Sequence, residues 1–100
     1  MNEILFKIDE AGQGGFYLME EEEVIAEMVI GISGSSLTVY HTEVFPKAEG
    51  KGMAKKLLIA MVEYARKNKL NVIPLCPFVH AQFKRHPEEY ADLWIEGKKI

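Results

Sequence analysis

The sequence predicts an α+β protein in which an antiparallel sheet is followed by a helix, a returning strand and two short helices. Three observations carry this prediction. Short β-prone segments separated by turn residues fill positions 4–44, the pattern of antiparallel strands. From about Gly50, apolar residues recur at helical spacing, which indicates an amphipathic helix. The short apolar segment at 71–76 then has the length of a buried strand that follows a crossover.

The first four strands are predicted to form a meander. Residues 4–8 and 16–19 are the first two strands, and the turn-rich stretch DEAGQGG joins them. The acidic residues 20–23 suit an exposed turn before a third strand at 24–30. The stretch GISGSS supplies a tight connection, and residues 37–44 then alternate apolar with polar side chains, as a half-buried strand does. Links this short join antiparallel neighbours.

The second half of the chain contains the expected helices. Apolar residues between 53 and 65 share one helix face, and charged residues occupy the other. The strand at 71–76 ends at Pro77, which has no N–H group to give to a sheet. Residues 78–85 and 88–94 are expected to form two short helices separated by a His-Pro pair. The aromatic residues Tyr40, Tyr64, Tyr90 and Trp94 are read as core residues.

Composition limits the classes of function. The 100 residues, 48% hydrophobic and 27% charged, fit one soluble domain over residues 1–100. The net charge of -3 argues against nucleic acid as a partner. The sequence has no signal-like segment and no apolar run near the ~20 residues that span a membrane, so no membrane association is expected. The one cysteine, Cys76, excludes an intrachain disulfide and favours a cytoplasmic setting.

The junction at residues 49–55, EGKGMAK, is a candidate anion site. The first N–H groups of a helix lack intrahelical partners, and the helix dipole is positive there, so a phosphate binds favourably. Gly50 and Gly52 allow the backbone to curl around such a group, and Lys47, Lys51, Lys55 and Lys56 add positive charge nearby. The alternative is that both glycines are ordinary turn and cap residues. The stretch matches neither the P-loop nor the dinucleotide fingerprint.

Four blocks of sequence together resemble a known family. They are HTEV at 41–44, GKGMA at 50–54, PLCPFV at 74–79 and RHPEEY at 85–90. In this order they are similar to the small single-domain GNAT-like (Gcn5-related) N-acetyltransferases. The resemblance implies a truncated GNAT fold, in which the antiparallel meander is followed by a helix, a splayed parallel strand and two short C-terminal helices. The chain differs from the family pattern at Glu49, where GNAT loops commonly carry Arg or Gln.

What the resemblance implies about the site is an acetyl-CoA (coenzyme A) site in the gap between the fourth strand and the strand that ends at Cys76. The diphosphate would lie on the loop, and the pantetheine amides would pair with the fourth strand as an added strand does. The implied cofactor-binding residues are Thr42, Glu43 and Val44 on the strand and Glu49, Gly50, Lys51, Gly52, Met53, Ala54 and Lys55 on the loop.

Cys76 and His41 are the candidate catalytic residues. The two are expected to lie close together near the thioester. A thiolate of Cys76, favoured by the nearby histidine, would accept an acetyl group and pass it to an amine, and His41 would act as a general base. The structural alternatives are that Cys76 is a buried core residue and that His41 is a hydrogen-bonded surface residue. His80 and His86 are weaker candidates. No metal is expected, because the three histidines and the cysteine have none of the usual ligand spacings.

The leading hypothesis is an acyl-CoA-dependent N-acetyltransferase, which works either by direct transfer with His41 as base or through an acetyl-Cys76 intermediate. Its amine acceptor is unknown; because the chain starts directly with a strand, the acceptor groove is expected to be open and to suit a protein or peptide amine. The rival hypothesis is a non-catalytic CoA or acetyl-CoA binding module that serves as a sensor or docking domain. A third reading is a structural α/β domain that binds no nucleotide. The sequence leaves the oligomeric state and the acyl group open.

Overall fold

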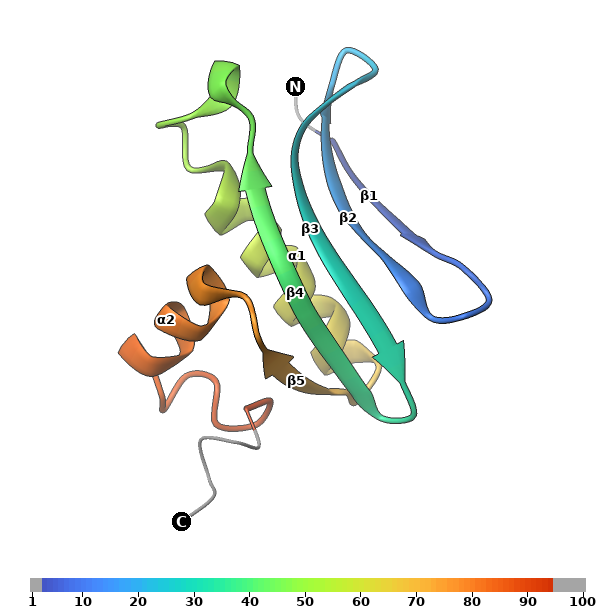
Figure 1. Ribbon diagram of the computed structural model, residues 1–100. Coiled ribbons are helices and arrows are strands. Elements are labelled where there is room, and N and C mark those ends of the chain that lie inside the picture. The colour runs from blue at the N-terminus through green and yellow to red at the C-terminus, as the bar shows by residue number, and fades with distance from the viewer. Residues whose placement is uncertain (1–2, 95–100) are drawn as a thin grey trace.

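The structure is a computed structural model that describes residues 3–94. Along the chain it contains the strands β1 (Glu3–Ile8), β2 (Gln13–Glu20), β3 (Glu23–Ser33) and β4 (Ser36–Val44), then a short 3₁₀ turn η1 (Pro46–Ala48) and the helix α1 (Met53–Lys67), and finally β5 (Asn71–Pro74) and α2 (Pro77–Arg85). The strands form one sheet in the order β1-β2-β3-β4-β5 (Figure 1). The predicted meander and the returning parallel strand are both confirmed.

The turns of the meander are those that the sequence indicates. In the link between β1 and β2, the side chain of Asp9 accepts hydrogen bonds from the backbone N–H groups of Ala11 and Gln13, both at 2.9 Å. Glu21 and Glu22 form the exposed turn between β2 and β3, and both have positive φ angles, 51° and 71°. This left-handed conformation is unfavourable for a residue with a side chain. The acidic turn therefore forms at a conformational cost.

β4 and β5 pair over a short distance and then separate. The parallel register runs from Ser36 opposite Asn71 to Val39 opposite Pro74. The N–H of Cys76 then donates to the carbonyl of Val39 at 2.9 Å, after which the chain turns into α2. Figure 1 shows β5 diverging from β4 at this point. Among residues 3–94, no strand therefore lies beside residues 40–44 of β4 on this edge.

The core lies between the sheet and the helices. α1 packs across β2, β3 and β4 and lies behind the sheet in Figure 1. The buried face of α1 is the one that the sequence pattern predicts, and its buried residues are Met53, Leu57, Leu58, Met61, Val62 and Ala65. Phe83 of α2 is fully buried and stacks on Tyr90, with ring centroids 4.5 Å apart. Within residues 3–94, no helix is long and apolar enough to cross a membrane.

The opposite face of the sheet has no helix over it within the described residues, as Figure 1 shows. Side chains on this face alternate with the buried ones along each strand. A shallow hollow of about 410 Å³ lies elsewhere, at the end of α2, whereas this face carries one of about 290 Å³ lined by Leu5, Lys7, Tyr17, Met19 and Val24. We refer to this uncovered side of the sheet as the open face.

The prediction of a second short helix at 88–94 is wrong. Residues 87–93 form successive turns, in which Tyr90 N–H bonds to His86 and Trp94 N–H bonds to Tyr90. A segment this short gains few helical hydrogen bonds for the cost of starting a helix. The segment is held by other contacts: Leu93 accepts a hydrogen bond from Val72 at 2.9 Å, and Arg66 donates to Asp92 at 2.9 Å. These contacts place Tyr90 and Leu93 in the core.

Candidate active site

The loop before α1 has the shape that anion binding requires. Gly50 and Gly52 have φ angles of 80° and 74°, in the left-handed region that favours glycine. Gly52 is the N-cap of α1, and no side chain caps the helix at this end. A Cβ atom added at either glycine would meet nothing within 4 Å. The space beside the loop is therefore open, and its backbone is accessible to a ligand.

The charges around this loop are mostly positive. Lys51, Lys55 and Lys56 are exposed, and the first turn of α1 contains no acidic residue. Lys47, in contrast, is engaged elsewhere, because its Nζ donates to the Glu23 carboxylate at the start of β3. This hydrogen bond raises the pKa of Lys47. Glu49 is exposed beside the glycines, so the sequence's departure from the family pattern leaves a carboxylate at the edge of the loop.

Cys76 occupies the point at which β4 and β5 separate. Its side chain is 2% exposed, and Sγ donates a hydrogen bond to Thr42 Oγ1 at 3.3 Å. Cys76 is also the N-cap residue of α2, and its carbonyl accepts a hydrogen bond from His80 N–H at 2.9 Å. The thiol is thus held between β4 and the first turn of α2. Thr42, which the sequence nominated only for its backbone, proves to be the side-chain partner of the thiol.

His41 lies on the other face of β4. Its Nε2 is 3.4 Å from Oε1 of Glu43, and its side chain is 58% exposed. In the register of β3 and β4, Thr42 is opposite the fully buried Met28, whereas His41 is opposite Val29. Neighbouring residues of a strand point to opposite faces. The structure therefore brings Cys76 to Thr42 and His41 to Glu43, and the expectation that the cysteine and the histidine form a neighbouring pair is wrong.

A β-bulge in β4 explains this arrangement. Val29 pairs with His41 and Ile30 with Val39, so that Tyr40 is an extra residue without a partner. Before the bulge, Leu37 and Val39 face the core; after it, Thr42 does. Without the bulge, simple alternation would send His41 to the core side. Tyr40 directly follows the core-facing Val39 and is 45% exposed, so the expectation that it lies in the core is wrong.

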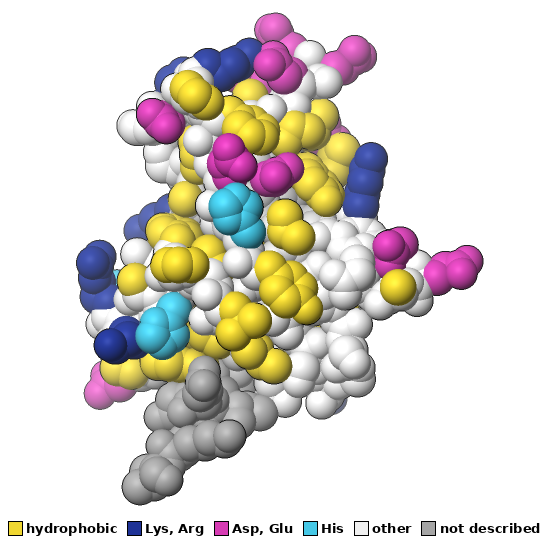
Figure 2. All heavy atoms as spheres, in the orientation of Figure 1, with side chains coloured by type: hydrophobic (Ala, Val, Ile, Leu, Met, Phe, Trp, Pro, Cys, Tyr) yellow, Lys and Arg dark blue, Asp and Glu magenta, His cyan; other side chains and the backbone are white. Residues whose placement is uncertain are grey.

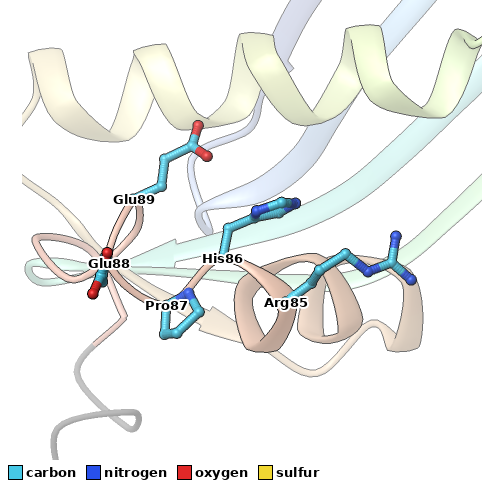
Figure 3. Close-up of a pocket in the computed structure, with 5 residues that line it drawn as sticks. All are labelled: Arg85, His86, Pro87, Glu88 and Glu89. Atoms are coloured by element: carbon cyan, nitrogen blue, oxygen red, sulfur yellow. The ribbon is translucent and has the colours of Figure 1, made fainter.

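The remaining predicted residues have separate surroundings. Glu43 and Val44 lie on the part of β4 that follows the last residue paired with β5. Residues 49–55 form the loop that contains the two glycines and the start of α1. His80 packs its ring against Trp94, with centroids 5.6 Å apart. His86 lines the pocket at the far end of α2, together with Arg85, Pro87, Glu88 and Glu89 (Figure 3). The length of α2, about 13 Å at 1.5 Å per residue, separates His86 from Cys76.

A sheet that opens between two parallel strands, with a glycine loop beyond one strand and a thiol where they part, is the arrangement expected of an acyl-CoA-dependent transferase. Comparison with known proteins identifies the family. A model of the GCN5-related N-acetyl-transferase family matches residues 15–93. A GCN5-like protein from Staphylococcus aureus, a candidate N-acetyltransferase, is 30% identical with a TM-score of 0.65, and the match covers 90% of this chain and 86% of that one. The chain belongs to the GCN5-related N-acetyltransferase family.

Two other solved structures share the fold at lower identity. The ribosomal-protein-S18-alanine N-acetyltransferase from Escherichia coli is 15% identical with a TM-score of 0.59, over 64% of this chain and 42% of that chain. The ribosomal-protein-alanine N-acetyltransferase from Brucella melitensis is 17% identical with a TM-score of 0.61, over 81% of this chain and 62% of that chain. The chain therefore spans less than two thirds of either enzyme. No curated protein sequence matches the chain.

Proposed function

We propose that this protein transfers an acetyl group from acetyl-CoA to an amine of a protein or peptide. The observation that carries the proposal is the opening between β4 and β5, which has the Cys76–Thr42 pair where the strands part and the glycine loop beyond the free end of β4. Family membership supports the choice of acetyl-CoA as the acetyl source.

The loop is proposed to hold the diphosphate. Gly50 and Gly52 leave the backbone of the loop accessible from the open space beside it. The unpaired N–H groups at the start of α1 favour the binding of an anion. Lys51 and Lys55 contribute positive charge, while Glu49 lowers it. The free edge of β4 at Thr42, Glu43 and Val44 offers backbone groups to the amides of the pantetheine arm, as a neighbouring strand would.

Cys76 is proposed to carry the acetyl group between the two substrates. Its Sγ attacks the thioester carbonyl, a new carbon–sulfur bond forms, and the bond to the sulfur of CoA breaks. The thiol proton leaves with CoA as its thiol. The amine then attacks the acetyl-Cys76 carbonyl in the opening between β4 and β5. A carbon–nitrogen bond forms, the carbon–sulfur bond breaks, and the exposed His41 accepts the proton that the nitrogen loses. The Cys76 thiolate takes a proton from water, and His41 returns its own proton to the solvent. Thr42 orients Sγ through its hydrogen bond.

Direct transfer is the second route, and the burial of Cys76 favours it. A side chain that is 2% exposed is the usual state of a structural cysteine. On this route the amine attacks acetyl-CoA itself, His41 accepts its proton, and Cys76 only packs beneath the thioester. The two routes differ in whether an acetylated protein ever forms.

Intact mass spectrometry tests the proposal. The protein is mixed with acetyl-CoA, beside the Cys76→Ala and His41→Ala variants. A single acetyl adduct that hydroxylamine removes, and that is absent only from Cys76→Ala, supports the acetyl-cysteine route. Turnover of an amine without such an adduct supports direct transfer. If CoA binds by titration calorimetry but no amine is acetylated, the protein is a binding module and the proposed activity is wrong.

A further inference from the structure

The open face carries an apolar patch immediately beside the proposed site. Tyr40 is 45% exposed, Ile73 is 38% exposed and Leu75 is 60% exposed. Ile73 is opposite Thr38 in the parallel register, and its neighbour Pro74 is opposite Val39, so the three side chains gather where β4 meets β5. Figure 2 shows this side of the molecule: hydrophobic side chains collect over the middle of the face, next to a histidine and acidic side chains. We call Tyr40, Ile73 and Leu75 the apolar patch.

Tyr40 is held on this face by a specific contact. A Cβ atom added to Gly31 would lie 3.0 Å from Cε2 and 3.1 Å from the hydroxyl oxygen of Tyr40. The ring therefore lies over Gly31, at a position where any other residue would displace it. Tyr40 points to the open face because it directly follows the core-facing Val39, and its ring lies beside Gly31 there. Exposed aromatic and aliphatic side chains grouped in this way mark interaction surfaces.

The charge next to the patch is negative and unbalanced. Glu43 is directly opposite Glu27 across β3 and β4, and like charges in this position destabilise a sheet. Within residues 3–94, Glu27 forms no ion pair, and the polar side-chain partner of Glu43 is the ring of His41. A cation placed between the two carboxylates would relieve their repulsion. The patch and this carboxylate pair lie on the two sides of His41 along β4.

We propose that the open face binds the acceptor as a peptide segment whose basic amine lies between Glu27 and Glu43 and whose neighbouring apolar side chain packs on the apolar patch. This inference rests on the proposed function and names its acceptor class: a lysine, or a chain-terminal amine, adjacent to an apolar residue. The cationic amine is drawn to the carboxylates in its protonated form, and His41, beside Glu43, is placed to accept the proton that attack requires.

A second copy of the chain is the competing occupant of the patch. The charge on the face argues against a pairing centred on Glu27 and Glu43, because a two-fold axis at that place would bring the carboxylates of both chains together. A peptide with a basic group complements that charge instead. The acceptor is therefore the occupant that the observations favour, and self-association is an outcome that the test must detect.

The test compares peptides and surface variants. The probes are two labelled short peptides with one lysine, which differ only in whether leucine or serine precedes the lysine. Binding in the presence of CoA is measured by fluorescence anisotropy, and acetylation by the KM and kcat for each peptide. The native protein is expected to bind the leucine peptide roughly tenfold more tightly, the preference that burying one aliphatic side chain gives.

Two variants and a control locate the surface. Leu75→Ser is expected to abolish the preference for leucine by raising the KM for the leucine peptide roughly tenfold. Glu27→Gln is expected to weaken the binding of both peptides equally. Ile59→Ser is the matched control, because Ile59 is 49% exposed on α1 and away from the open face. Equal preference for leucine in the native protein and in Leu75→Ser overturns the inference, as does a dimer in sedimentation that Leu75→Ser dissociates.

The readouts separate this inference from the proposed function. Peptide binding needs no chemistry, so tight binding of the leucine peptide without any acetylation contradicts the proposed function alone. Acetylation of both peptides with no preference contradicts the acceptor surface alone. CoA binding, measured by titration calorimetry, involves no acceptor and serves as the reference in every variant on either route.

Discussion

The Sγ atom of Cys76 donates a hydrogen bond to Oγ1 of Thr42 at 3.3 Å, across the point at which β4 and β5 part. The contact joins the one cysteine of the chain to a residue on the strand along which acetyl-CoA is expected to lie. It fixes the direction of a buried sulfur atom, and it links the two sides of the opening.

Replacing Thr42 with valine tests the importance of this bond. Valine keeps the shape of the side chain but removes the hydroxyl acceptor, and one lost hydrogen bond is worth about 1 kcal/mol. Acetylation of Cys76 is expected to slow roughly fivefold to tenfold, while the dissociation constant of CoA stays nearly constant. Rapid-quench mass spectrometry gives the rate. Thr42→Ser should restore it; if serine is as slow as valine, the hydroxyl does not orient the sulfur.

Replacing Gly52 with alanine is expected to weaken CoA binding. The φ angle of 74° disfavours any side chain at a cost of about 1 kcal/mol, and the new methyl group also enters the open space that the diphosphate is proposed to occupy. Gly34 offers a matched control, because its φ angle is 59° and its surroundings are equally open. Both variants should lose similar stability in thermal unfolding. Equal CoA affinity in the two would remove the loop from the binding site.

The turn between β2 and β3 should accept glycine with a gain in stability. Glu22 has a φ angle of 71°, and Glu22→Gly removes a left-handed strain of about 1 kcal/mol. The midpoint of urea unfolding is expected to rise. Glu10→Gly is the control, since Glu10 is in the other exposed turn but is not among the residues with positive φ; it should lower the midpoint. A fall in both variants would contradict the strain assigned to Glu22.

The ion pair of Lys47 and Glu23 predicts a small loss of stability at alkaline pH. The pKa of Lys47 is raised above 10.5, chiefly by its hydrogen bond to Glu23. A raised pKa in the folded protein means that this contribution is complete below the unfolded value and is lost as the pH rises through the folded value. Thermal unfolding on both sides of that pH, compared with Glu23→Gln, measures it. The variant should show a weaker decline at alkaline pH than the native protein.

Much of the fold follows from patterns that the sequence shows directly. The change from alternating to helical period near Gly50 and the short apolar segment at 71–76 locate the meander, α1 and β5. The prediction of a helix at 88–94 is wrong because aromatic residues four apart occur both in helices and in turns that pack on a core. Tyr90 is buried in either case, so its position carries no information about the local backbone.

The site is predictable in its parts but not in its pairing. The glycine loop and the place of Cys76 follow from local sequence, whereas the partners of Cys76 and His41 depend on the phase of β4. A single bulge at Tyr40 reverses that phase. The sequence contains a faint sign of it, since Leu37 and Val39 occupy odd positions and the later apolar residue Val44 an even one. Propensity alone does not say where between them the alternation breaks.

The bulge at Tyr40 also decides which reactive group lies on each side of β4. On one side of the strand lies the sulfur that would receive the acetyl group, and on the other lies the imidazole that would relieve the incoming amine of its proton. Each group has its own hydrogen-bond partner, Thr42 or Glu43, so either can be altered without disturbing the other. A regular strand that kept Tyr40 would turn His41 toward the core and Thr42 away from the thiol, whereas deleting Tyr40 would leave both residues on their present sides.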